Sequence, residues 1–221
     1  MDKDQWIQSE KVAALRDKNN WYMPYSANPG CVRGFAFHNQ RVYASVEVGG
    51  LMVSDDYGRT WDLAAGSSGK PREIPGPGGI HPDVHSVASH SASADLVFAP
   101  TGGGFFTSED GGTTWENKYN AYSRAVWVDP QDATHMLLGP AEGVGRGGRI
   151  EETIDTGETW HLRMSNINDQ WTVAMVERFV GADGEIYAIL SNGKILTAHA
   201  DDFSWQYLLP GIGNAVMVAL F

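Results

Sequence analysis

Five polar residues stand at the openings of apolar segments that recur along the chain. They are Arg33, His85, Arg124, Thr172 and Asn214. Guanidinium groups bind carboxylates and phosphates through paired hydrogen bonds, and an imidazole exchanges a proton near neutral pH. If the fold gathers these five residues at one point, they would bind an anionic ligand.

The same residue types would also suit an enzyme that acts on acidic glycans. Elimination from a uronic acid needs its carboxylate neutralised and a base that removes the adjacent proton. Arg33 and Arg124 would provide the first, and His85 or Tyr122 the second. Hydrolysis by two carboxylates stays open, although no pair of acids stands out.

A repeated motif indicates the elements that position these residues. The segments SDDYGRTW (54–61), SEDGGTTW (108–115) and TIDTGETW (153–160) share the pattern Ser/Thr-x-Asp-x-Gly-x-Thr-Trp. The Asp can accept hydrogen bonds from the N–H groups that follow it, and the Gly permits positive φ. The Trp carries a large apolar surface into the next strand. We therefore expect three β-hairpin corners with a structural role.

Around each Trp, and again around Trp205, four short alternating segments follow one another. Short strands rich in glycine and aromatics at this spacing are typical of propeller blades. Residues 214–221 look like a first strand, and residues 4–25 look like strands two to four. The sequence therefore predicts one domain, residues 1–221. Its fold is an all-β, five-bladed β-propeller of four-stranded antiparallel blades, closed by pairing of the N- and C-terminal strands. Four blades with irregular tails is the alternative.

The three corners resemble the Asp-box (BNR) repeats of the sialidase-like propeller superfamily. Similar repeats occur in xyloglucan-degrading glycosidases, sortilin-type receptors and photosystem assembly factors. The resemblance implies a propeller whose first strands start near the axis on a ligand face. It implies no activity, because the family's Asp boxes are structural and lie away from that face.

Sialidase chemistry itself is disfavoured. The resemblance would need an arginine triad, a tyrosine nucleophile with its glutamate, and an acid aspartate. Arg33 and Arg124, with Arg72 or Arg146, would imitate the triad beside Tyr122, with Asp83 or Asp169 as the acid. However, Glu73 separates Arg72 from the Ile-Pro pair of the family's Arg-Ile-Pro motif. Sialidases also have six blades.

Loop lengths and charge point to the same face. The longest connections are residues 66–83 and 139–149, and long loops on a compact scaffold are often functional. Six basic residues fall on the ligand face of this arrangement: Arg33, Lys70, Arg72, Arg124, Arg146 and Arg149. Acids on that face would offset part of this charge: Glu73, Asp83, Glu142 and Asp169. Trp171 is a candidate platform for a sugar ring. The expected ligand is therefore an anionic small molecule or acidic glycan, and a protein-docking scaffold is a further alternative.

Composition narrows the partners. A net charge of −11 disfavours nucleic acid and anionic membranes. The lone Cys31 excludes an internal disulfide framework, and the glycine-rich segments lead into no helix, which disfavours a nucleotide loop. His81, His85 and His90 lie close in sequence, but adjacent arginines would repel a metal ion, so neither metal nor cofactor is expected. The sequence shows no signal-peptide pattern and no membrane span, so we expect a soluble chain.

Overall fold

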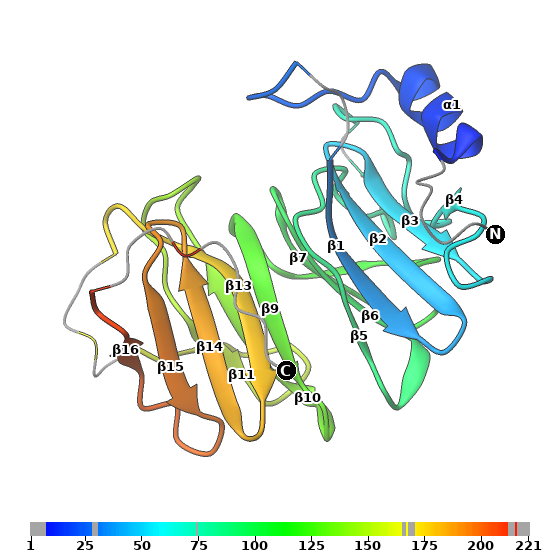
Figure 1. Ribbon diagram of the computed structural model, residues 1–221. Coiled ribbons are helices and arrows are strands. Elements are labelled where there is room, and N and C mark those ends of the chain that lie inside the picture. The colour runs from blue at the N-terminus through cyan, green and yellow to red at the C-terminus, as the bar shows by residue number, and fades with distance from the viewer. Residues whose placement is uncertain are drawn as a thin grey trace, which may run out of the picture.

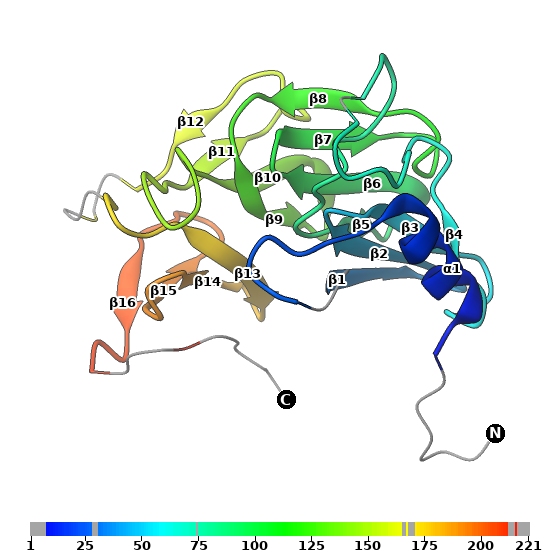
Figure 2. The same cartoon turned by 90° about the horizontal axis from the view of Figure 1, so that it is seen from above.

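The computed structural model describes residues 8–27, 31–73, 75–164, 167, 171–211 and 215 of the 221-residue chain. Its named strands form four antiparallel sheets of four strands each, and each sheet is built from consecutive strands. Figure 2 shows these sheets following one another around a centre.

The bounds of the strands show how closely each sheet follows one stretch of sequence. The first sheet contains β1 (Cys31–His38), β2 (Arg41–Glu47), β3 (Gly50–Ser54) and β4 (Asp62–Leu63). The second contains β5 (Ala88–His90), β6 (Ser93–Thr101), β7 (Gly104–Ser108) and β8 (Glu116–Tyr119). The third contains β9 (Ser123–Asp129), β10 (Asp132–Pro140), β11 (Glu151–Thr153) and β12 (His161–Leu162). The fourth contains β13 (Val176–Ala182), β14 (Glu185–Leu190), β15 (Ile195–His199) and β16 (Gln206–Leu208).

The sheets are held together face to face by apolar side chains. Tyr43 and Leu51 of the first sheet pack with Val97 of the second. Phe98 and Phe105 of the second sheet pack with Met136 and Leu138 of the third, and a third cluster joins the third and fourth sheets. Burial of such side chains contributes roughly 1.5–3 kcal/mol each. These blade-like sheets therefore support one another in sequence order.

The predicted corners are confirmed in their hydrogen bonding. Asp56 Oδ1 accepts from the Thr60 N–H at 2.8 Å, and Ser54 Oγ accepts from the Gly58 N–H at 2.9 Å. The corners at Asp110 and Asp155 repeat this pattern. The indole of Trp61 donates to the Gly58 carbonyl at 2.9 Å. Each corner thus closes on its own side chains and fixes the turn from the third to the fourth strand.

The predicted blade count was wrong, because the described residues form four sheets and not five. The segment predicted as strands two to four contains the helix α1 (Glu10–Asn19), seen against the β1–β4 sheet in Figure 1. Ser9 caps this helix and Asn20 ends it in the left-handed conformation, and its Ala, Leu, Lys and Arg residues favour helix. Residues 214–221, predicted to complete the ring, lie outside the described residues except for Ala215. Closure by paired terminal strands therefore stays a prediction.

Helix α1 packs its partly buried Val12 and Leu15 on one face of the first sheet, beside the buried Trp21. The Trp21 indole donates to the Gly69 carbonyl at 2.6 Å, which joins the helix to the long loop at residues 66–83. Among the described residues, no helix is long and apolar enough to cross a membrane.

Candidate functional site

The first strands of three sheets carry a β-bulge at the same position. Pairing passes from Val32–Val46 to Gly34–Ser45, which leaves Arg33 as the extra residue of β1. The same shift leaves Arg124 as the extra residue of β9 and Glu177 as that of β13. A bulge re-aims the side chain of the extra residue and is common beside functional sites.

The second sheet has an equivalent irregularity. Between the bridge of Val84 with Thr101 and the pair of Ala88 with Phe98, the first strand has one residue more than its partner. His85 opens this segment and donates its backbone N–H to the Pro100 carbonyl. Each sheet therefore contributes one polar residue at the start of its inner strand.

Three of these residues form one charged cluster. The Arg124 guanidinium contacts both oxygens of Glu177, at 3.0 and 2.9 Å. Arg33 lies 3.5 Å from Glu177 and 3.4 Å from Glu47, the last residue of β2. Burial acts to lower the pKa of Arg124, but the adjacent Glu177 carboxylate raises it above its usual value. Both arginines are therefore already paired with protein carboxylates.

His85 is 3 % exposed and lies beside this cluster. Its Nδ1 is 2.7 Å from the Ser123 carbonyl oxygen, and its Nε2 is 3.2 Å from Asp83 Oδ2. Its ring also contacts Tyr122, with 4.8 Å between the centroids. The Tyr122 hydroxyl accepts from Arg124 Nε at 2.6 Å, and burial raises the pKa of this phenol despite the arginine. The structure thus brings together Arg33, His85, Tyr122 and Arg124 as the sequence suggested.

A pocket of about 290 Å³ opens between the first strands. Its charged and polar lining consists of Arg33, His85, Ser86, Arg124, Glu177 and Arg178. Its apolar lining includes Phe35, Val87, Val126, Phe179 and Val180. Three arginines against one glutamate give the pocket wall a net positive charge.

Arg178 is the arginine of this wall that is free to meet a ligand. It is exposed, it donates to the Arg33 carbonyl at 3.3 Å, and no carboxylate lies within ion-pair distance of it among the described residues. The Nε of Arg33 is buried without a hydrogen-bond partner. Polar groups left without partners at a pocket are the ones that a ligand can satisfy.

The fourth sheet does not follow the register expected from the sequence. Thr172 was predicted to open its first strand, but β13 begins at Val176 and the bulge residue is Glu177. Thr172 is exposed and outside the pocket lining. Asn214 lies outside the described residues. Glu177, the acid that pairs with both Arg33 and Arg124, was therefore not predicted from the sequence.

The remaining predicted residues lie elsewhere. Arg72 lines a second, surface pocket with Lys18, Tyr22 and Lys70, and its guanidinium lies 5.5 Å from the Tyr22 ring. Arg146 is exposed in a turn of the loop at residues 139–149. Trp171 is 5 % exposed and packs into the cluster between the third and fourth sheets, so it offers no face to a sugar. Of the predicted acids, Asp83 reaches the site, and Asp169 lies outside the described residues.

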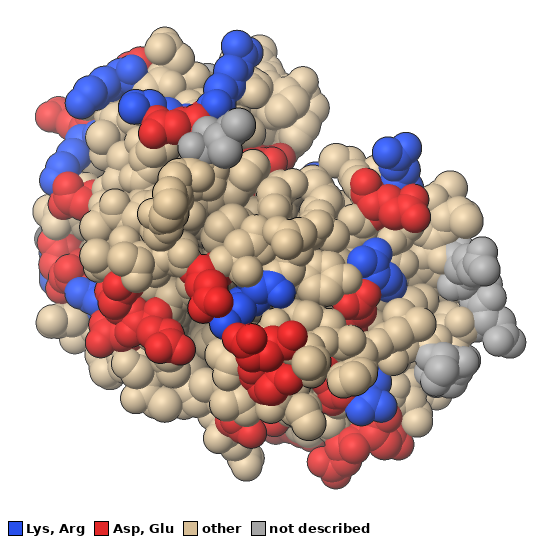
Figure 3. All heavy atoms as spheres, turned by 180° about the vertical axis from the view of Figure 1, so that it is seen from behind, with Lys and Arg blue, Asp and Glu red and all other residues tan. Residues whose placement is uncertain are grey.

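The two long loops are tied to the sheets. In the loop at 66–83, Ile80 donates to the Gly66 carbonyl, and Gly50 of the first sheet donates to Pro82. In the loop at 139–149, Gly148 donates to the Ala174 carbonyl at 3.0 Å. On the face shown in Figure 3, basic side chains lie scattered among acidic ones instead of forming one basic surface. The arginines that the structure does gather are those of the pocket wall.

Two further residues, Tyr25 and Glu47, belong to the site although no sequence motif predicts them. The Tyr25 hydroxyl donates to Glu47 Oε2 at 2.5 Å, and burial together with this carboxylate raises the pKa of Tyr25 to about 12. Glu47 is itself 3 % exposed. An acid at the end of an apolar strand is the one signal in the sequence that points to Glu47.

No family model matches the chain, and no curated protein matches it. Solved structures do share its fold. An ancestral GH74 enzyme matches with a TM-score of 0.61 and 18% identity, over 83% of this chain and 25% of that one. YCF48 bound to D1 peptide matches with a TM-score of 0.54 and 14% identity, over 87% of this chain and 57% of that one. A structure of the nidogen–laminin complex matches with a TM-score of 0.59 and 10% identity, over 80% and 64%.

These likenesses establish a β-propeller type of fold. The chain spans about a quarter of the GH74 enzyme and more than half of the other two chains. At this level of identity the comparison carries the fold alone.

Proposed function

We propose that the protein binds a carboxylated carbohydrate in the pocket between the first strands. The observation that carries this proposal is the wall of three arginines and one glutamate, in which Arg178 has no acidic partner among the described residues. A guanidinium at a partly desolvated wall binds a carboxylate through charge-assisted hydrogen bonds, each stronger than a neutral one.

A carbohydrate is the favoured carrier of that carboxylate for two reasons. The pocket combines the arginines with the rings of Phe35 and Phe179, which offer apolar surface to a sugar. Structures of the same fold also include a GH74 xyloglucanase from Xanthomonas campestris, which matches with a TM-score of 0.57 and 12% identity. The ligand class is therefore an acidic glycan or a fragment of one.

The test is calorimetric titration with trigalacturonate and N-acetylneuraminic acid, with neutral galactose oligomers as the comparison. Arg178→Ala should weaken binding of the acidic sugar by about tenfold or more, because a hydrogen bond to a charged group contributes about 1.5–3 kcal/mol. Arg146→Ala, which removes an exposed arginine outside the pocket, should leave the affinity unchanged. Equal binding of acidic and neutral sugars, or none, would overturn the proposal.

An enzyme at this site is less well supported than a binder. Both ring nitrogens of His85 already face protein oxygens, and burial raises the pKa of Tyr122. Both side chains are therefore held by protein partners and are not free to remove a proton from a substrate. Detection of an unsaturated or shortened sugar product in the same titrations would reverse this order.

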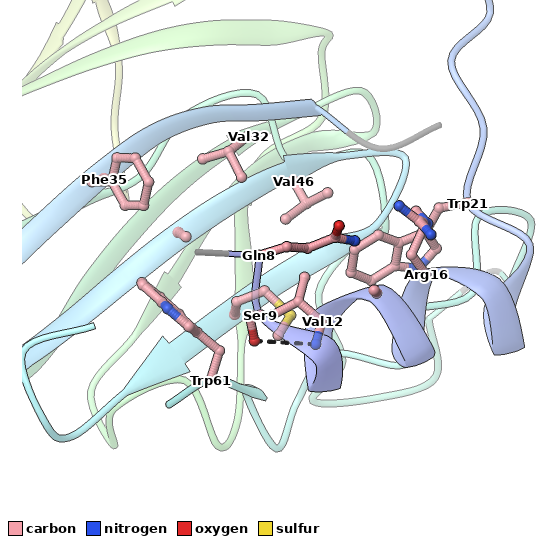
Figure 4. Close-up of a pocket in the computed structure, with 12 residues that line it drawn as sticks. Gln8, Ser9, Val12, Arg16, Trp21, Val32, Phe35, Val46 and Trp61 are labelled. Atoms are coloured by element: carbon pink, nitrogen blue, oxygen red, sulfur yellow. Dashed lines mark hydrogen bonds between the residues drawn. The ribbon is translucent and has the colours of Figure 1, made fainter. Parts of the chain in front are cut away.

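Protein docking is the second candidate function, and exposed apolar residues on β1 favour it. Val32, Phe35 and Phe37 are exposed, and Phe35 lies 6.1 Å from the ring of Trp61. Figure 4 shows Val32, Phe35 and Trp61 on the wall of a largely apolar pocket between the first sheet and α1. A protein with a docking function should bind none of the sugars in the titration. Phe37→Ser should instead weaken its affinity for a protein partner.

A further inference from the structure

A second group of ligand atoms lies beside the arginines. One ligand atom each from Glu47, Asp83 and His85 lies within 4.8 Å of the others. Glu47 ends β2, whereas Asp83 and His85 stand two residues apart just before β5. The site therefore forms where the first sheet meets the long loop that leads into the second.

The histidine is held so that its Nε2 faces the carboxylates. A backbone carbonyl only accepts hydrogen bonds, so His85 Nδ1, 2.7 Å from the Ser123 oxygen, carries a proton and donates it. This leaves Nε2 as the nitrogen that faces Asp83 Oδ2, 3.2 Å away. A cation placed between these two atoms would contact both of them.

Each carboxylate also has a support on its far side. The Val48 N–H donates to Asp83 Oδ1 at 3.2 Å, which leaves Oδ2 for the site. The Tyr25 hydroxyl holds Glu47. Ligands of bound metals are oriented in this way by hydrogen bonds from backbone and side-chain groups behind them.

Glycine makes room for the arrangement. A Cβ at Gly102 would lie 2.5 Å from Asp83 Oδ2. The Gly102 N–H instead donates to the Asp83 carbonyl at 2.9 Å and brings the turn close. The close approach to Asp83 accounts for Gly102, the first glycine of the segment GGGFF (102–106), without a phosphate-binding role.

The local charge accepts a cation. The cluster holds the carboxylates of Glu47, Asp83 and Glu177 against the guanidinium groups of Arg33 and Arg124. The sequence predicted that the arginines would exclude a metal ion, but both are paired with Glu177, and Arg33 also with Glu47. Counted with Arg178 of the pocket wall, three arginines face three carboxylates, and among the described residues Asp83 is the carboxylate without an arginine partner.

From this arrangement we propose that Glu47, Asp83 and His85 bind a divalent metal ion of the zinc class. One imidazole and two carboxylates are ligands that Zn²⁺ accepts, and three protein ligands leave an open position. Ligand atoms on one Zn²⁺ lie roughly 3.3 Å apart, which the Nε2–Oδ2 distance already matches. Glu47 would complete the set by a small rotation of its side chain.

The experiment begins with chelator-treated full chain and titration with Zn²⁺ and Co²⁺ in the absence of any anionic ligand. We expect one equivalent to bind, and Co²⁺ to give the visible absorption of a low-coordinate site. His85→Gln and Asp83→Asn should each weaken binding by at least about tenfold, since even changes behind the ligands typically weaken it 10- to 100-fold. Mg²⁺ should not compete.

A matched control separates this site from adventitious binding. His199 and Asp201 form an exposed pair at 3.4 Å, so His199→Gln should leave the stoichiometric binding unchanged. If Zn²⁺ binds wild type and His85→Gln equally, or fails to bind wild type, the proposal is wrong and a proton occupies the place of the ion. Asp83→Asn, a change of similar shape in a loop, keeps the test decisive if His85→Gln does not fold.

Discussion

Two histidines, the buried His85 and the half-buried His135, each lie beside carboxylates, but they are arranged differently. His135 Nδ1 is 3.0 Å from Asp129 Oδ2, and its Nε2 is 3.0 Å from Glu152 Oε1. Each ring nitrogen therefore faces a carboxylate, one on β9 and one on β11. His85 has a carbonyl on one side and Asp83 on the other.

The difference shows what backbone placement does to one residue type. The rings of Trp127 and Phe203 meet that of His135 edge to face, at 5.6 and 5.7 Å. Both of its ring nitrogens contact protein carboxylates, so it acts as a structural bridge inside the third sheet. The carbonyl of Ser123 instead fixes the His85 tautomer, and this leaves its other nitrogen for a cation.

The largest expected effect comes from breaking the His135 bridge. His135→Leu removes the histidine partner of Asp129 and one of the two partners of the buried Glu152, which keeps its contact with Arg163. We expect the free energy of unfolding to fall by about 2 kcal/mol, within the range for loss of a hydrogen bond to a charged group. Chemical denaturation at pH 7 measures it. Adding Asp129→Asn should recover part of the loss.

The matched substitution at His85 has a smaller expected effect on the stability of the metal-free protein. His85→Gln removes the imidazole contact with the Ser123 carbonyl and should cost about 1 kcal/mol, the typical net contribution of such a bond. If both histidine variants lose the same stability in the same denaturation series, the distinction between a structural bridge and an open site fails.

The next test of the comparison is a substitution of Glu177, the carboxylate of the pocket wall. Glu177 pairs with Arg33 and Arg124. In the same way, Asp129 and Glu152 both contact His135. Glu177→Gln keeps the shape and removes one negative charge, so an acidic sugar should bind about tenfold more tightly, a gain of about 1.4 kcal/mol. Calorimetric titration checks this; weaker binding would mean that Glu177 itself holds the ligand.

The smallest effect is expected at an exposed carboxylate of the corners. Hydrogen bonds from the Thr159 side chain and N–H lower the pKa of Asp155 to about 2, from a usual value of 3.8. Its stabilising effect is therefore complete above pH 3.8 and lost as the pH falls through about 2. Asp155→Asn should lower Tm slightly at pH 6 and not at all near pH 1.5. A difference in Tm that is independent of pH would contradict this account.

The corners were readable from the sequence because their hydrogen bonds lie within eight residues. Asp110, for example, bonds to Thr113 and Thr114 just ahead of it. The first strand of the fourth repeat was misplaced, so that Thr172 stood for Glu177. The position of its bulge is set by pairing with β14, which the sequence does not display.

The N-terminal segment failed for a related reason. Its aromatic and apolar residues suited strands, yet Ser9 and Asn20 act as helix caps and the residues between them favour helix. The fold then uses that helix to cover part of the first sheet. An apolar pattern alone does not say which element carries it.

The sequence by itself determined the corners, the short strands and the grouping of strands in fours, because each depends on neighbours along the chain. Tertiary structure decided that Arg33, Arg124 and Glu177 meet, and that Glu47 joins Asp83 and His85. Those contacts join residues of different sheets that only bulges and packing bring together. The residue type determines what chemistry a side chain can do, whereas the tertiary structure determines which groups it contacts.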